Sequence, residues 1–192
     1  MNHLAHIYLS GDDDGLKIGN FIADSVKGKA YLKYPEAIQK GILLHRKIDE
    51  FTDSHPIARK SASKFSARFG LYSGVIVDMV YDHFLAANWK DYHSVALKTY
   101  SENFYTLLEE NFDQLPARVQ GFYPYMVKAN WFLMYSTLTG IEEILFQMNR
   151  RVKRGVQLHL AVDELRENYS SLETEFRDFF RDLEGYVLKI AN

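Results

Sequence analysis

The scarcity of proline constrains the fold of this chain most, because it leaves long stretches free to form uninterrupted helices. The 192 residues contain four prolines, at positions 35, 56, 116 and 124. After Pro35, which stands at a favoured helix start, Ile38, Ile42 and Ile48 follow roughly helical spacing. No repeat, linker or domain boundary is evident. The sequence therefore predicts an all-α fold, in which residues 1–192 form one bundle of about seven or eight helices.

Several helices can be predicted from their boundaries. A helix over residues 57–69 should follow Pro56 and end at Gly70, a common C-terminal stop. The β-branched run at residues 75–77 is typical of a strand, but the long apolar segment around it, residues 72–89, favours a buried helix. The other expected helical segments are 91–112, 116–136 with interruptions at Gly121 and Pro124, 139–155 with a basic end, and an unbroken 158–190.

Composition and charge exclude several classes of function. The formal net charge of −2 gives no overall attraction to nucleic acid or anionic lipid. No apolar run approaches the length of a membrane span, and no basic and apolar leader opens the sequence. We therefore expect a cytoplasmic protein that binds neither nucleic acid nor a membrane. Because cysteine is absent, a bound metal would be held by His, Asp, Glu or water.

Polar residues with metal-binding chemistry are concentrated in the first half of the chain. In the segment GILLHRKIDEFTD, residues 41–53, His45, Asp49 and Asp53 repeat every four residues. On a helix they would form one stripe carrying an imidazole and two carboxylates. Such a stripe is either a solvated, ion-paired surface or part of a metal site, and its spacing alone does not decide between them.

Two aspartates in an otherwise apolar helix favour the metal site. Asp78 and Asp82 lie in the segment IVDMVYDHF, which has almost no other charge. Burying two carboxylates on one face is costly unless a cation offsets them. That cation could be a metal, or an Arg or Lys from a neighbouring helix. Imidazole combined with several carboxylates suits Mn²⁺, Mg²⁺, Fe²⁺ or Zn²⁺.

Four motifs occur in a fixed order that resembles one known family. They are MNxLAH at residues 1–6, GNxxADxVxG at 19–28, GIxxHRxIDxFTD at 41–53 and DxxxDHFL at 78–85. A later block contains Trp131, Tyr135, Gly140, Leu145, Met148 and Arg151. Together they resemble the acyl carrier protein phosphodiesterases, a family regarded as a divergent branch of the all-helical HD-type phosphohydrolases. The resemblance covers nearly the whole chain.

The resemblance implies a metal-dependent enzyme whose substrate partner is holo-acyl carrier protein. The expected reaction removes the 4′-phosphopantetheine arm and leaves the apo-protein. A divalent metal is expected as cofactor, with Mn²⁺ or Mg²⁺ favoured and Fe²⁺ or Zn²⁺ as alternatives. The expected metal ligands are His6, Asp24, His45 and Asp82. Asp49, Asp78 and His83 are expected to serve catalysis, and His83 could instead be a structural donor to the backbone.

Basic residues are expected to bind the substrate. Arg46 and Lys27 would neutralise the phosphate. Lys60 and Lys64, in the acid-free segment 54–70, would form part of a docking rim for an acidic carrier protein. A second basic run lies at residues 150–154. Two alternatives stay open: a phosphohydrolase of related fold acting on a small nucleotide or phosphoester, and a non-catalytic helical interaction protein.

Overall fold

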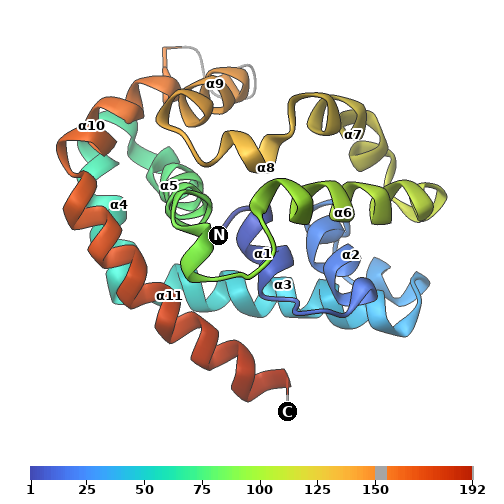
Figure 1. The fold of residues 1–192 in the computed structure, drawn as a ribbon. Helices are drawn as coiled ribbons and strands as arrows, with labels where there is room; N and C mark the ends of the chain where they lie inside the picture. Colours follow the sequence, from blue (N-terminus) through green and yellow to red (C-terminus); the bar gives the residue numbers. More distant parts are fainter. Residues whose placement is uncertain (150–154, 192) are drawn as a thin grey trace.

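A computed structural model describes residues 1–149 and 155–191 of the chain. Within these ranges the fold is all-α with short 3₁₀ turns and no strand (Figure 1). Eight helices have nine or more residues, in agreement with the predicted seven or eight. The helices are α1 (His3–Tyr8), α2 (Asp14–Ile22), α3 (Glu36–Ser54), α4 (Pro56–Phe69), α5 (Ser73–Ala87), α6 (Leu97–Glu110), α7 (Ala117–Ala129), α8 (Trp131–Met134), α9 (Leu138–Met148), α10 (Ala161–Glu167) and α11 (Tyr169–Ala191).

The predicted boundaries of the two central helices are confirmed. Helix α4 begins with Pro56 at its first position and ends at Gly70, whose φ of 52° lies in the region that favours glycine. Helix α5 is continuous through the β-branched run, and most of its residues are buried. Burial on all sides explains why this segment lacks the clear apolar and polar faces of a surface helix.

Three other predicted boundaries are wrong. Helix α6 begins at Leu97 rather than 91, because the Trp89 indole donates to the Val95 carbonyl and fixes a loop there. Helix α7 is interrupted neither at Gly121 nor at Pro124. Pro124 is exposed, so water can satisfy the carbonyl that loses its partner. The break comes at Asn130, with φ of 46° and a side chain that caps α8.

The segment over 158–190 is also not one helix, because it breaks at Asn168 between α10 and α11. The Asn168 side chain donates to the carbonyl of Glu164 and satisfies the end of α10. The basic run at residues 150–154, expected at the end of a helix, lies outside the described residues.

A glycine contact sets the distance between α2 and α3. A Cβ added to Gly19 would lie 2.1 Å from the Ile38 carbonyl oxygen, and one added to Gly41 would lie 2.4 Å from that of Leu16. Only glycine permits this approach of two helix backbones. The contact brings the end of α2 against the middle of α3, which is where the polar residues of the two helices meet.

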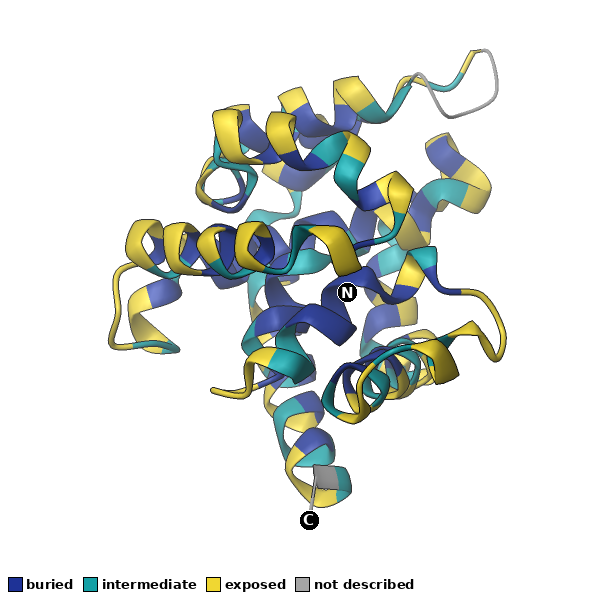
Figure 2. Ribbon diagram, turned by 90° about the vertical axis from the view of Figure 1, so that its right-hand side faces the viewer, coloured by how far each residue is buried: buried dark blue, intermediate teal, exposed yellow. Residues whose placement is uncertain are grey.

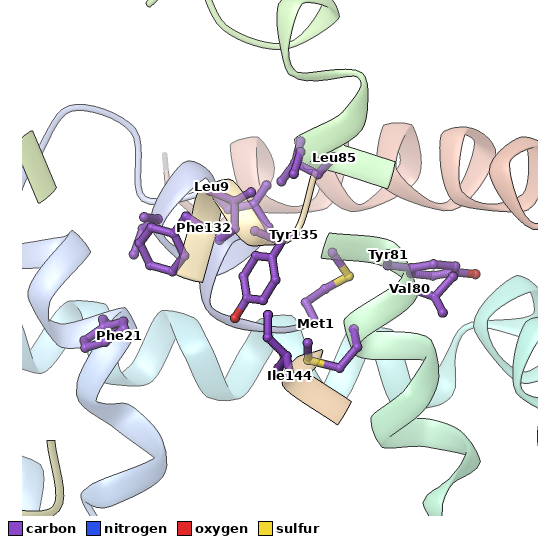
Figure 3. Close-up of a cluster of buried hydrophobic side chains, with 14 of the residues drawn as sticks. Met1, Leu9, Phe21, Val80, Tyr81, Leu85, Phe132, Tyr135 and Ile144 are labelled. Carbon is purple, nitrogen blue, oxygen red and sulfur yellow. The ribbon is translucent and has the colours of Figure 1, made fainter. Parts of the chain in front are cut away.

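The core is one cluster to which helices from α1 to α11 contribute, and most residues of α1 and α5 are buried in it. Figure 2 shows buried residues facing inward and exposed residues on the outer helix faces. Met1, Tyr135 and Ile144 gather in one cluster with Val80 and Tyr81 of α5 (Figure 3). The start of the chain is therefore packed inside the fold, which places α1 next to the polar residues of α2 and α3. None of the helices in the described ranges has the length and apolar character needed to span a membrane.

Candidate metal centre

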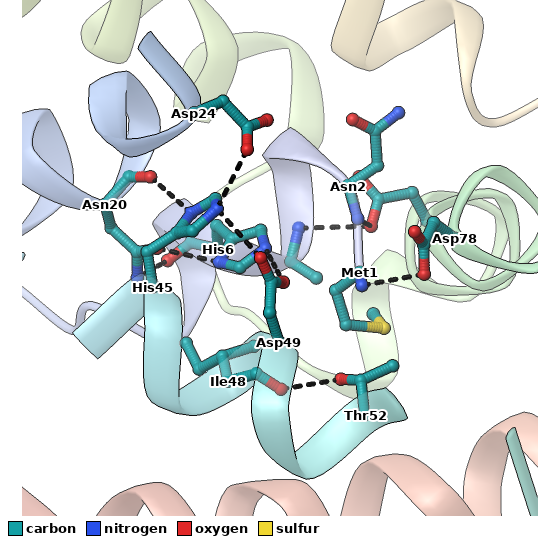
Figure 4. Close-up of polar contacts among 12 residues, drawn as sticks. Met1, Asn2, His6, Asn20, Asp24, His45, Ile48, Asp49, Thr52 and Asp78 are labelled. Carbon is teal, nitrogen blue, oxygen red and sulfur yellow. Dashed lines mark hydrogen bonds and ion pairs between the residues drawn. The ribbon is translucent and has the colours of Figure 1, made fainter. Parts of the chain in front are cut away.

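Four side chains from three neighbouring segments converge beside the α2–α3 contact (Figure 4). His6 comes from α1, Asp24 from the 3₁₀ turn η1 (Ala23–Ser25), and His45 and Asp49 from α3. The His45 Nε2 atom lies 3.1 Å from an Asp49 oxygen and 3.4 Å from an Asp24 oxygen. The His6 Nε2 atom lies 3.3 Å from the other Asp49 oxygen. One ligand atom from each of His6, His45 and Asp49 fits within 4.8 Å of the others.

Asn20 orients both imidazoles. Its side-chain oxygen lies 2.7 Å from His6 Nδ1, and its backbone oxygen lies 2.8 Å from His45 Nδ1. Each of these oxygens accepts a hydrogen bond from the Nδ1–H group, so the Nε2 atom of each ring is the one that faces Asp49. The Asn20 amide in turn donates to the His6 carbonyl and to Ser10, which fixes its own orientation. Metal-binding histidines are held in this way, with the second ring nitrogen donating to an oxygen.

The Nε2 atom of His6 has no hydrogen-bond partner among the described residues, although it is buried. Its contact with Asp49 is close enough for an ion pair but does not have hydrogen-bond geometry. A buried nitrogen without a partner is costly and calls for an explanation. A cation bound between His6, His45 and Asp49 would satisfy it, so the donor set fits a metal ion.

The electrostatics of the cluster also favour a cation. Burial lowers the pKa of His6 to about 4, so this imidazole is neutral at physiological pH. Burial also opposes charge on His45, but the carboxylates of Asp24 and Asp49 outweigh it and raise the pKa to about 9. Burial would raise the pKa of Asp49, but the neighbouring imidazoles of His45 and His6 hold it far below its usual range. The two carboxylates therefore attract positive charge to one point, whether a proton or a metal.

The structure does not place Asp78 and Asp82 in this group. The Asp82 carboxylate is fully buried and accepts from the backbone N–H groups of Asn2, Leu4 and Ala5. It caps α1. Asp78 lies 2.8 Å from the amino group of Met1 (Figure 4). The cation expected to offset these two aspartates is thus present as the Met1 ammonium group, a source not considered from the sequence.

Two of the other predicted site residues are held by contacts of their own. The His83 Nδ1 atom lies 2.8 Å from the Tyr135 carbonyl oxygen and its Nε2 atom 3.0 Å from the Tyr169 hydroxyl, as in the structural alternative. The guanidinium of Arg46 donates to the carbonyls of Val26 and Gly28, which ties the loop after η1 to α3. The third residue of the stripe, Asp53, is exposed and outside the group.

The two lysines expected at the docking rim both contact a buried glutamate. Lys64 lies 2.6 Å and Lys60 3.1 Å from a carboxylate oxygen of Glu175 on α11. Glu175 also accepts from the hydroxyl of Ser61. These contacts join α4 to α11 and neutralise the carboxylate. Lys27, in contrast, is exposed and forms no ion pair within the described part of the chain.

Asn20 is the site residue that the sequence prediction missed. Its motif, GNxxAD, contains Asp24, so proximity in sequence was a usable signal. The role of Asn20 depends on the helix crossing at Gly19 and Gly41, which places its carbonyl against His45. That crossing is not visible in a helical pattern.

The fold and the site together define the class of protein. It is an all-helical protein in which two imidazoles and two carboxylates, brought together by helix packing, form a candidate metal centre. The comparisons with known proteins are more specific. The family model for acyl carrier protein phosphodiesterase matches residues 1–183, and the chain belongs to this family of enzymes. Proteins named acyl carrier protein phosphodiesterase include one from Pectobacterium atrosepticum, 31% identical over 181 residues, and one from Yersinia pestis, 30% identical over the same length. Each alignment covers 94% of both chains.

No solved structure shows a significant match to this chain. The relation to HD-type phosphohydrolases, expected from the sequence, therefore stays a prediction.

Proposed function

We propose that this protein hydrolyses the phosphodiester that joins a serine of holo-acyl carrier protein to 4′-phosphopantetheine. Water adds to phosphorus, the bond from phosphorus to the serine oxygen breaks, and the serine oxygen takes up a proton. The products are apo-acyl carrier protein and 4′-phosphopantetheine. The observation that carries the proposal is the convergence of His6, His45 and Asp49, with an unpartnered buried nitrogen, in a member of the phosphodiesterase family.

The types of ligand atom in the cluster narrow the choice of metal ion. The proposed ligands are His6, His45 and Asp49, with Asp24 as a fourth candidate. Asp82, which was expected as a ligand from the sequence, is no longer among them. Two imidazole nitrogens suit Fe²⁺ or Zn²⁺, and the carboxylates suit Mn²⁺. Mg²⁺ fits this set least, because it prefers oxygen ligands and keeps several of its waters. We therefore keep Mn²⁺ as the favoured ion. When bound, it would supply Lewis acidity to a phosphoryl oxygen and acidify the attacking water.

Asp24 is the residue best placed to orient the attacking water. Its side chain is 64% exposed, whereas those of His6 and His45 are almost fully buried. A hydrogen bond with His45 holds the pKa of Asp24 at about 2, so the carboxylate is ionised. It therefore stands at the solvent edge of the cluster and can orient water by accepting a hydrogen bond from it. Lys27, three residues further along the chain, can help to neutralise the phosphate.

Intact-mass spectrometry of the carrier protein tests the proposed function. Purified enzyme is stripped with a chelator and divided into samples with and without added Mn²⁺. We expect holo-acyl carrier protein to lose one phosphopantetheine only in the sample with Mn²⁺, and Asp49→Asn to abolish the loss. Turnover of small phosphodiesters without any turnover of holo-acyl carrier protein would contradict this function and favour a small-substrate phosphohydrolase.

A further inference from the structure

A small pocket opens directly beside the candidate metal centre. Its volume is about 70 Å³, and it lies between the first two helices and the α7–α8 segment. Asp24 belongs to both places, because it lines the pocket and lies 3.4 Å from His45. A group bound at the cluster would therefore have this pocket next to it. The residues that matter for its chemistry are His3, Phe21, Asp24, Arg118, Phe122 and Trp131.

The walls of the pocket are aromatic. The Phe122 ring stacks on Trp131 with centroids 5.7 Å apart, and on His3 at 6.3 Å. Phe21 completes the wall at 4.9 Å from His3. Burial lowers the pKa of His3 to about 4, so its ring is uncharged and compatible with an apolar ligand. His3, Phe122 and Trp131 are only half-buried, which leaves part of each ring accessible.

A cation stands at the same pocket. Arg118 is exposed and forms no ion pair with any acid in residues 1–149 or 155–191. Its guanidinium can make a bidentate contact with a phosphate, which Arg46 cannot easily do while it holds the loop carbonyls. The pocket thus combines an apolar slot with a free arginine, next to a cluster suited to phosphate chemistry.

A larger groove continues from the pocket. Its volume is about 390 Å³, and Ser25 lines both spaces. The larger groove falls in the range of roughly 300–1,000 Å³ that is usual for small-molecule sites, whereas the pocket is too small for a whole ligand. Val26, Ala30, Tyr34 and Gln114 give the groove a mixed apolar and polar lining. An elongated ligand with apolar and amide segments would suit the two spaces in succession.

We propose that the pocket formed by His3, Phe21, Phe122 and Trp131 seats the phosphate-proximal part of the pantetheine arm, and that Arg118 contacts its phosphate. The branched dimethyl carbon next to the phosphate would pack against the aromatic rings. The amide portion of the arm would then follow the groove past Ser25. This inference rests on the proposed function and makes these residues the determinants of specificity for the arm.

The test compares two substrates in the same variants. The substrates are holo-acyl carrier protein and bis(p-nitrophenyl) phosphate, a diester without an arm. We expect Phe122→Ala and Trp131→Ala to lower kcat/KM for holo-acyl carrier protein at least about tenfold, the scale of a lost aromatic contact. Cleavage of the small diester should stay within about threefold of wild type. Tyr125→Ala is the matched control, because this aromatic residue of α7 is 68% exposed and does not line the pocket.

Direct binding supplies a second measurement that does not need turnover. Titration calorimetry with 4′-phosphopantetheine should show weaker binding to metal-free Phe122→Ala and Arg118→Gln than to the metal-free wild type. A wild type that leaves holo-acyl carrier protein intact would overturn the proposed function. If the wild type cleaves holo-acyl carrier protein but the variants keep the wild-type ratio of the two kcat/KM values and the wild-type affinity, the pocket assignment alone is overturned.

Discussion

The partners of each ring nitrogen separate the buried histidines into two kinds. His6 and His45 each donate a hydrogen bond from Nδ1 to one of the two oxygens of Asn20, and their Nε2 atoms face Asp49. His83 uses both nitrogens on Tyr135 and Tyr169, so it has none left for a metal or a substrate. A histidine that binds a metal needs a free lone pair and a fixed tautomer. Asn20 fixes the rings of His6 and His45 with Nε2 directed into the cluster, whereas the Nε2 atom of His83 is occupied by the Tyr169 hydroxyl.

The role of Asn20 leads to a prediction about metal affinity. Asn20→Ala removes the side-chain oxygen that orients His6 and leaves the backbone oxygen that orients His45. We expect Mn²⁺ affinity to fall by about 10–100-fold, the usual effect of losing such a partner. Equilibrium dialysis with metal analysis measures this effect. Ser10→Ala is the control, because it removes the hydroxyl that contacts the Asn20 amide and the carbonyls of His6 and Leu16 but leaves both oxygens of Asn20 in place. Equal affinities in both variants would rule out the role of Asn20.

The burial of His83 predicts a pH dependence of stability. Burial lowers the pKa of His83 below its ordinary value of 6.5. The folded state therefore binds a proton at His83 less readily than the unfolded state does. The contribution of neutral His83 to the free energy of unfolding is complete above about pH 6.5 and is lost as the pH falls. We expect the free energy of unfolding to fall more steeply below pH 6.5 in wild type than in His83→Gln.

Denaturant titrations at pH 8 and pH 5 measure that difference. Other buried histidines, such as His6, contribute equally to both proteins and cancel. Parallel pH profiles in the two proteins would show that His83 is not held neutral by the fold.

Among the helices, α1 depends on α5 for its position. The Asp82 carboxylate of α5 accepts from three backbone N–H groups at the start of α1, and α1 carries His6 into the cluster. The glycine contact between α2 and α3 brings the other ligands to the same place. The candidate centre is therefore built by helix packing, and a residue such as Asp82 can support it without contacting a metal ion.

This arrangement predicts different effects for Asp82 and Asp49. Asp82→Ala leaves buried donors unpaired and should lower the free energy of unfolding by at least about 2 kcal/mol. The folded fraction should still bind Mn²⁺, and Asp82→Asn should cost less because its carbonyl oxygen can accept. Asp49→Asn should lose Mn²⁺ with little change in stability. Calorimetric unfolding with metal analysis of each variant checks both results, and loss of metal from a stable Asp82→Asn would make Asp82 a ligand.

The sequence predicts elements and residue types better than contacts. Scarce proline and helical spacing were enough for the all-α fold and for the bounds of α4. The motifs also predicted His6, Asp24 and His45 as ligands and Asp49 as a catalytic residue, but they grouped Asp78 and Asp82 with them, and the structure places these two beside the start of the chain. The sequence pattern could not reveal that the Met1 ammonium offsets Asp78, or that Lys60 and Lys64 pair with Glu175, because these contacts join distant segments.

At the scale of the whole molecule, the fold encloses the imidazole nitrogens of the candidate centre and leaves one edge of the cluster open. Asp24 stands at that edge, with the aromatic pocket and the larger groove beyond it. A substrate can therefore present its phosphate at the edge while its arm extends along the surface. This division suits a substrate whose two halves are a folded protein and a flexible chain.

The central claim is that His6, His45 and Asp49 hold the metal ion used for hydrolysis. A crystal of the Mn²⁺-loaded protein, measured with anomalous scattering, tests it most directly. We predict a strong anomalous peak bonded to the Nε2 atoms of His6 and His45 and to an Asp49 oxygen, at about 2.0–2.3 Å, the usual distance for such ligands. A Mn²⁺ peak beside Asp78 and Asp82 instead, or no peak at the cluster in a preparation that cleaves holo-acyl carrier protein, would contradict the claim.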